Sequence, residues 1–190
     1  AELDGPSAEI DAEQDAWRIQ AAKDWNTGWH VTEVASATSS GGTTLRTLED
    51  NSVLAEGDNP DRDTYEIITR TDATDLSLFR LEALTHDSLP HKGAGRADNS
   101  NFVLSELELE ARPAGDDNAE WTPIRLVAAA ADHQQMNGPY PVTATIDGVV
   151  GAANGWAVDG MTRREDRVAV YAAAEPFGFA GGTELRTTLR

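Results

Sequence analysis

The sequence predicts an all-β fold, an antiparallel β-sandwich of the jelly-roll kind preceded by a short N-terminal helix or arm. Many short apolar segments are separated by turn residues such as Gly41-Gly42, Asn137-Gly138-Pro139 and Gly181-Gly182. No regular alternation of strand and helix patterns accompanies them, and that alternation is what a parallel α/β sheet requires. Short strands joined by Gly- and Pro-rich turns are typical of sandwiches and jelly rolls.

The N-terminal stretch has a different pattern from the rest. Ile10, Trp17 and Ala21 recur at helical spacing within residues 9–23. We therefore expect an N-terminal arm or linker helix over residues 1–24 and one sandwich domain over residues 25–190. A chain of 190 residues is long enough for one such domain.

From Trp29 onward the apolar segments are those of strands. The expected strands cover residues 31–37, 43–48, 53–56, 65–71, 76–84, 102–110, 124–129, 168–173 and 184–189. In the segment 102–110, Val103, Leu107 and Leu109 should point to one side and Glu106 and Glu108 to the other. Such alternation indicates a half-buried antiparallel strand.

The segment between the strands expected at 76–84 and 102–110 is longer and more polar than a hairpin turn needs. It is rich in Gly, Pro, Asn, His and charged residues. We expect it to be either a ligand site or a structural brace.

Composition limits the classes of partner. The 33 acidic and 15 basic residues give a net charge of −18, which disfavours nucleic acid and anionic membrane surfaces as partners. No stretch approaches the roughly 20 apolar residues of a membrane-spanning helix, so membrane insertion is not expected. Cysteine is absent, which excludes disulfides, thiolate metal sites and a cysteine nucleophile.

Oxygen-bearing side chains in and around the long loop make calcium a candidate cofactor. Carboxylates, amides and backbone carbonyls are the ligands of hard cations, and a loop site needs no fixed spacing. The candidate calcium ligands are Asp87, Asp98, Asn99, Asn101 and Glu106, with Glu82 as an alternative to Glu106.

The aromatic residues suggest a second kind of site, because sugars stack their C–H faces on aromatic rings while polar groups bind their hydroxyls. The candidate ligand-binding residues are Trp156, Tyr140, Asn154, Asp159, Arg163 and Arg164. The alternative role of Trp156 is to anchor the core beneath the loops.

Several motifs resemble those of a known group of domains. Ile146-Asp147-Gly148 followed by Gly155-Trp156 is similar to the Asp-Gly … Trp element of discoidin-like, galactose-binding-like sandwiches. More specifically, the chain resembles the middle domain of large planctomycete surface proteins that also carry a c-type cytochrome module and planctomycete-specific domains of unknown function. The matching residues are Gly42-Thr-Thr-Leu45, Leu48 to Asp50, Ser52-Val-Leu-Ala55, Gly57, Pro60, Asp63, Tyr65, Arg80-Leu-Glu-Ala-Leu84, Leu89-Pro90, Gly95-Arg96, Asn101 to Glu106, Tyr140-Pro-Val142 and Gly181-Gly-Thr183.

The resemblance implies a periplasmic or cell-surface protein that binds polysaccharide and has flanking domains, including a c-type cytochrome. Ala94 and Ser100 depart from the usual residues of that group, and both changes affect only loop shape. The haem-attachment motif C-x-x-C-H is absent, so any redox role belongs to other domains.

The sequence therefore predicts a non-catalytic carbohydrate-binding module of a larger extracytoplasmic protein, with calcium as a candidate structural ion. The main alternative is a structural spacer that packs against neighbouring domains and binds no small ligand. A hydrolase or lyase on a jelly roll is a third hypothesis, which needs convergent acid and base groups that the sequence does not reveal.

Overall fold

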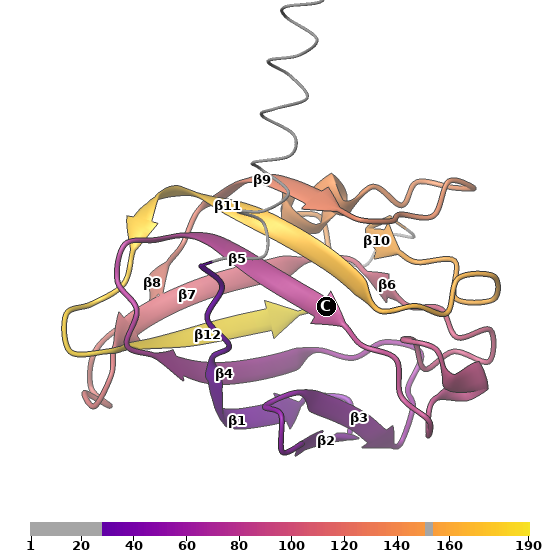
Figure 1. Ribbon diagram of the computed structural model, residues 1–190, viewed down its shortest axis with the longest axis horizontal. Helices are drawn as coiled ribbons and strands as arrows, with labels where there is room; N and C mark the ends of the chain where they lie inside the picture. Colours follow the sequence, from indigo (N-terminus) through magenta and orange to yellow (C-terminus); the bar gives the residue numbers. More distant parts are fainter. Residues whose placement is uncertain (1–27, 151–153) are drawn as a thin grey trace, which may run out of the picture. The chain divides into compact units, whose positions relative to one another are not determined.

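The computed structural model describes residues 28–150 and 154–190. The chain divides into the units Ala1–Val31 and Thr32–Arg190, and the strands all belong to the second unit (Figure 1). The arm or helix expected over residues 1–24 lies outside the described residues. In the described part of the chain, no helix is long and apolar enough to cross a membrane.

Two antiparallel sheets form the body of the second unit, and they confirm the predicted sandwich class (Figure 1). The larger sheet has the order β1 (Glu33–Ser39), β4 (Tyr65–Thr71), β12 (Thr183–Leu189), β7 (Leu107–Pro113) and β8 (Thr122–Pro123). The smaller sheet has the order β5 (Leu76–Ala83), β11 (Arg167–Phe177) and β9 (Leu126–Ala131).

Smaller elements complete the fold. A hairpin is formed by β2 (Thr43–Thr47) and β3 (Val53–Gly57), and a short ribbon by β6 (Val103–Leu104) and β10 (Trp156–Ala157). Two 3₁₀ turns, η1 (Pro90–Lys92) and η2 (Val142–Ile146), lie in the connections.

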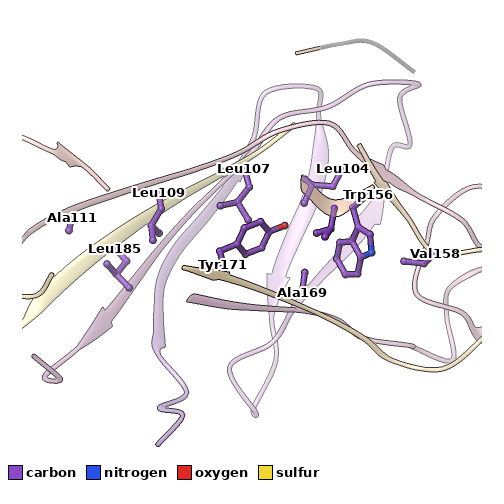
Figure 2. Close-up of a cluster of buried hydrophobic side chains, with 10 residues drawn as sticks. Leu104, Leu107, Leu109, Ala111, Trp156, Val158, Ala169, Tyr171 and Leu185 are labelled. Atoms are coloured by element: carbon purple, nitrogen blue, oxygen red, sulfur yellow. The ribbon is translucent and has the colours of Figure 1, made fainter. Parts of the chain in front are cut away.

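The core lies between the two sheets (Figure 2). Leu107, Leu109 and Leu185 face inward from the larger sheet, and Ala169 and Tyr171 face them from the smaller one. On β7 the alternate residues Leu107, Leu109 and Ala111 are buried, as expected when one face of the sheet is covered.

The segment 102–110 departs from the expected alternation. Val103 is 43% exposed and Glu106 only 5% exposed, although Leu107 and Leu109 are buried as predicted. The backbone N–H groups of both Ser105 and Glu106 donate to the carbonyl of Arg190, and the chain passes from β6 to β7 at this point. The break inverts the alternation, so the predicted orientations of Val103 and Glu106 were wrong.

The outer face of the larger sheet carries a buried ionic cluster. Glu184, only 2% exposed, accepts bonds from Arg70 at 2.7 Å and from Arg112 at 2.8 Å. Burial raises the pKa of Glu184, but the bonds from the two arginines outweigh it, so the pKa lies below its ordinary value. The Trp121 ring lies 4.5 Å from the guanidinium carbon of Arg112 and 4.6 Å from that of Arg186, within cation–π range.

Candidate functional site

The base of the long loop between β5 and β6 is a structural brace. Arg96 donates from Nη1 to Oγ1 of Thr43 at 3.1 Å and from Nη2 to the carbonyl of Gly57 at 2.9 Å. The amide of Asn59 in turn donates to the carbonyl of Arg96 at 3.1 Å. These bonds fasten the β2–β3 hairpin to the loop, so the polar residues that suggested a ligand site serve the fold here.

Close backbone packing fixes the far end of the same loop. A Cβ atom on Gly95 would lie 2.1 Å from the carbonyl oxygen of Asn101, and one on Gly160 would lie 2.0 Å from that of Ser100. Only glycine tolerates such approaches. The side chain of Ser100 is completely buried and its hydroxyl donates to the carbonyl of Pro90.

The loop residues expected to bind calcium do not gather around one point. Asp87 forms an exposed ion pair with Lys92 at 2.9 Å, and Asn99 accepts a bond from the Asn101 backbone. The side-chain oxygen of Asn101 accepts the N–H of Val158 at 3.0 Å. Asp98 is exposed. The amide oxygens that were candidates for metal ligation are therefore already bonded within the protein.

Glu106 has different surroundings from those four residues. Its Oε1 accepts the backbone N–H of Gly148 at 3.3 Å, and its Oε2 is buried without a hydrogen-bond partner. Burial raises the pKa of Glu106, the N–H of Gly148 lowers it, the neighbouring charges of Asp147 and Glu108 raise it, and the charge of Arg190 lowers it. The net effect is a raised pKa. An unpaired buried carboxylate is costly unless another group compensates it.

A second buried oxygen without a partner lies just before β10, where the Oδ1 atom of Asn154 has no hydrogen-bond partner. Trp156 pairs antiparallel with Leu104, so the chain before Trp156 and the chain after Leu104 lie at the same end of the β6–β10 ribbon. Together with Asp147, Glu106 and Asn154 form a group of oxygen acceptors at one end of the sandwich, which we call the Glu106 site. This arrangement has the chemistry of a hard-cation site.

Among the described residues, no group of three or more His, Asp or Glu side chains is close enough to hold a metal ion. A cation at the Glu106 site would therefore rely on two carboxylates, an amide oxygen and backbone carbonyls. Calcium accepts such mixed oxygen ligands.

Trp156 cannot present a ring face to a sugar in this structure. Its side chain is completely buried in the core, where Figure 2 shows it beside Leu104 and Val158. The indole N–H donates to the carbonyl of His133 at 2.8 Å, and the ring of Phe102 packs edge-on against it at 5.3 Å. The expectation that Trp156 contacts a ligand is therefore corrected, and the alternative role of core anchor is the one observed.

The other predicted sugar-binding residues separate into distinct places. The carboxylate Oδ2 of Asp159 accepts a hydrogen bond from Nε2 of His133 at 3.0 Å, and the backbone carbonyl of Asp159 accepts the N–H of Arg163 at 2.9 Å. Arg163 and Arg164 are exposed on the same loop. Asn154 belongs to the Glu106 site, and the half-buried Tyr140 packs beside Gly138.

An open depression beside β9 was not predicted from the sequence. It has a volume of about 480 Å³. Its lining includes Ala129–Ala131, the polar residues His133, Gln134 and Thr143, and the exposed Met136. All of the lining comes from one stretch of the chain, residues 129–143, which runs from β9 into η2. Asp147 was also missed as a candidate ligand, although Ile146-Asp147-Gly148 could have indicated it.

Comparisons with protein-family models, with curated proteins and with solved structures found no match to the chain.

Proposed function

We propose that the domain is a non-catalytic, calcium-stabilised structural module of a larger extracytoplasmic protein. The observation that carries the proposal is the Glu106 carboxylate, which is buried at one end of the sandwich with an unpaired oxygen. Two features that suggested a ligand site also support a structural role, because Trp156 anchors the core and the long loop braces the β2–β3 hairpin.

The residues of the Glu106 site fit calcium better than they fit a transition metal. Glu106, Asp147 and Asn154 offer only oxygen atoms, and calcium prefers oxygen. A bound divalent cation would neutralise the unpaired carboxylate and give the buried amide oxygen a partner. Its role would be to fix the chain around Asp147 against β6 and β7.

Thermal unfolding with calcium chloride and with EDTA tests this role. We expect calcium to raise the melting temperature of the wild-type protein, since a ligand at 100 times its Kd stabilises the folded state by about 2.7 kcal/mol. Glu106→Gln should abolish this response. Glu108→Gln is the matched control, because Glu108 lies two residues away with its side chain half exposed and paired with Arg190.

Two results would contradict the calcium role. One is an unchanged melting temperature in calcium, magnesium and EDTA. The other is an equal calcium response in wild type and Glu106→Gln, which would place the ion elsewhere.

The role within a larger protein is supported by the resemblance to domains that lie beside c-type cytochrome modules at the cell surface or in the periplasm. We expect the loops around residues 134–150 to exchange their amide hydrogens more slowly in the complete gene product than in the isolated 190-residue chain. Equal exchange rates in both would argue against packing on neighbouring domains at this end.

Polysaccharide binding is the second candidate function, and the depression beside β9 favours it. His133, Gln134 and Thr143 offer hydrogen-bonding groups there, and the net charge of −18 favours a neutral glycan over a polyanionic one. A glycan array probed with calcium and with EDTA tests it. Binding that Thr143→Arg abolishes would support this function, because Thr143 is exposed on the wall of the depression. An array without any bound glycan would eliminate it.

A further inference from the structure

Strand β9 is an edge strand that no charge or proline protects. It is the last strand of the sheet β5-β11-β9, and no strand within residues 28–150 or 154–190 pairs with its other side. Its sequence, Leu-Val-Ala-Ala-Ala-Ala, has no charge, proline or glycine. Exposed apolar edges of this kind pair readily with another strand.

The other sheet edges are protected in recognisable ways. The edge strand β8 is two residues long and contains Pro123. The edge strand β1 has a register shift between Val34 and Ser36. The edge strand β5 carries Arg80 and Glu82. Short edges, bulges, prolines and charges all discourage pairing between molecules. β9 also has a register shift, between Leu126 and Ala128, but its residues 128–131 pair regularly with β11 and carry none of the other features.

The backbone of β9 presents hydrogen-bonding groups to the open side. The N–H of Asp132 donates to the carbonyl of Val168 on β11. In an antiparallel strand, every second residue directs its N–H and C=O groups to the same neighbouring strand. Residues 128 and 130 therefore bond to β11, while Ala129 and Ala131 direct their N–H and C=O groups away from it. No described residue accepts or donates there.

The depression lies along this open side. Three consecutive residues, Ala129, Ala130 and Ala131, line it. Successive side chains of a strand point to opposite faces of the sheet, so a hollow that touches three in a row follows the strand's edge. A hollow therefore lies beside the free N–H and C=O groups, and Pro141, Val142 and Thr143 also line it.

We propose that β9 pairs antiparallel with β9 of a second copy of this chain, about a two-fold axis through Ala129. Hydrogen-bonded partners must both direct their groups outward, so Ala129 lies opposite Ala129. Ala131 then comes opposite Val127, which lies at the register shift of β9. In this register the exposed Ala128 lies opposite Ala130 of the other copy. The pairing joins the two smaller sheets into one continuous sheet and is closed by its symmetry.

The charges along the strand favour a second copy as the occupant. Residues 126–131 are uncharged, so no like charges oppose each other within the ladder. Arg125 precedes the strand and Asp132 follows it, and antiparallel pairing brings the basic end of each copy to the acidic end of the other.

The net charge sets the conditions for association. Two chains that each carry −18 repel one another at long range, and salt screens this repulsion. Raising NaCl from about 0.02 M to about 0.5 M shortens the Debye length from about 20 Å to about 4 Å. We expect the dimer Kd to fall by about tenfold or more over this range, whereas a dimer held mainly by ion pairs would weaken.

Sedimentation equilibrium over a concentration series at both salt levels measures this Kd. Ala131→Pro should abolish dimerisation, since it removes an outward N–H but no bond to β11. Leu78→Pro is the matched control, because β5 pairs with the other side of β11 and alternation directs the N–H of Leu78 to the outer edge. This control should dimerise like the wild type, and thermal unfolding verifies that both variants fold.

A pair of charge variants tests the register without introducing proline. The double variant Ala128→Lys/Ala130→Lys brings two positive charges face to face across the two-fold axis. The double variant Ala128→Glu/Ala130→Lys brings a negative and a positive charge face to face at the same positions. We expect the first variant to be monomeric and the second to dimerise. A monomeric wild type at both salt levels, or equal association of the two charge variants, would overturn the proposal.

Discussion

Replacing Trp156 by alanine tests whether this residue is a core anchor or a ligand contact. Its side chain is completely buried, and truncating a buried tryptophan to alanine costs about 3–5 kcal/mol. The change also leaves the carbonyl of His133 without its indole donor, which adds about 1 kcal/mol. Because domains of this size are stable by only about 5–15 kcal/mol, we expect Trp156→Ala to be close to unfolded.

Urea unfolding followed by far-ultraviolet circular dichroism measures this loss. Trp156→Phe keeps an aromatic ring beside Phe102 but removes the N–H donor, so it should lose about 1–2 kcal/mol. Met136→Ala is the control, because Met136 is 82% exposed and should change stability by less than about 0.5 kcal/mol. A loss below about 1 kcal/mol in Trp156→Ala would refute the anchor role. If the expected loss occurs, Trp156→Ala is unsuitable for testing sugar binding, because unfolding alone would remove it.

Three further predictions concern buried polar groups. Burial raises the pKa of Glu106 in the folded state. Without calcium, the contribution of Glu106 to the free energy of unfolding is therefore present at low pH and is lost as pH rises through the folded-state pKa. Glu106→Gln should remove this part of the pH dependence, which urea unfolding in EDTA measures. The pKa of Glu184 is lowered in the folded state, so its contribution to the free energy of unfolding is present above the unfolded-state pKa and is lost as pH falls through the folded-state pKa. Glu184→Gln should lower the free energy of unfolding by about 3 kcal/mol at pH 7 and flatten its dependence on pH on the acid side. Arg96→Ala should lower the free energy of unfolding by about 1–2 kcal/mol and speed amide hydrogen exchange in the β2–β3 hairpin, whereas unchanged exchange would contradict the brace.

Much of the fold could be predicted from local pattern. The strand expected over residues 65–71 is observed with the same bounds as β4, and most of the other expected strands overlap observed ones. Strands with one buried face alternate in polarity, and glycine and proline mark their turns, so both signals are local. The break between β6 and β7 was missed because it depends on the carbonyl of Arg190, which is distant in sequence.

The candidate sites were harder to predict, because the same residue types serve binding and packing. Trp156 would suit a sugar platform as well as a core, and only its burial distinguishes the two roles. Asn101 has the oxygen of a calcium ligand, yet that oxygen accepts the N–H of Val158. Sequence identifies which groups can bind a ligand, but not which of them the folded chain already uses.

The two buried carboxylates, Glu106 and Glu184, show why an unpaired group is informative in this fold. Both have less than a tenth of their surface exposed, but Glu184 is held by two guanidinium groups and Glu106 by one long N–H bond. The charge of Arg190 also acts on Glu106, but burial has the larger effect and the pKa is raised. An uncompensated buried charge costs several kcal/mol, and either protonation of Glu106 or a bound cation would lower this cost. A calcium titration of the wild type and of Glu106→Gln separates these two states. If Glu106 binds a cation, the wild type responds to calcium and Glu106→Gln does not; if Glu106 is only protonated, neither protein responds.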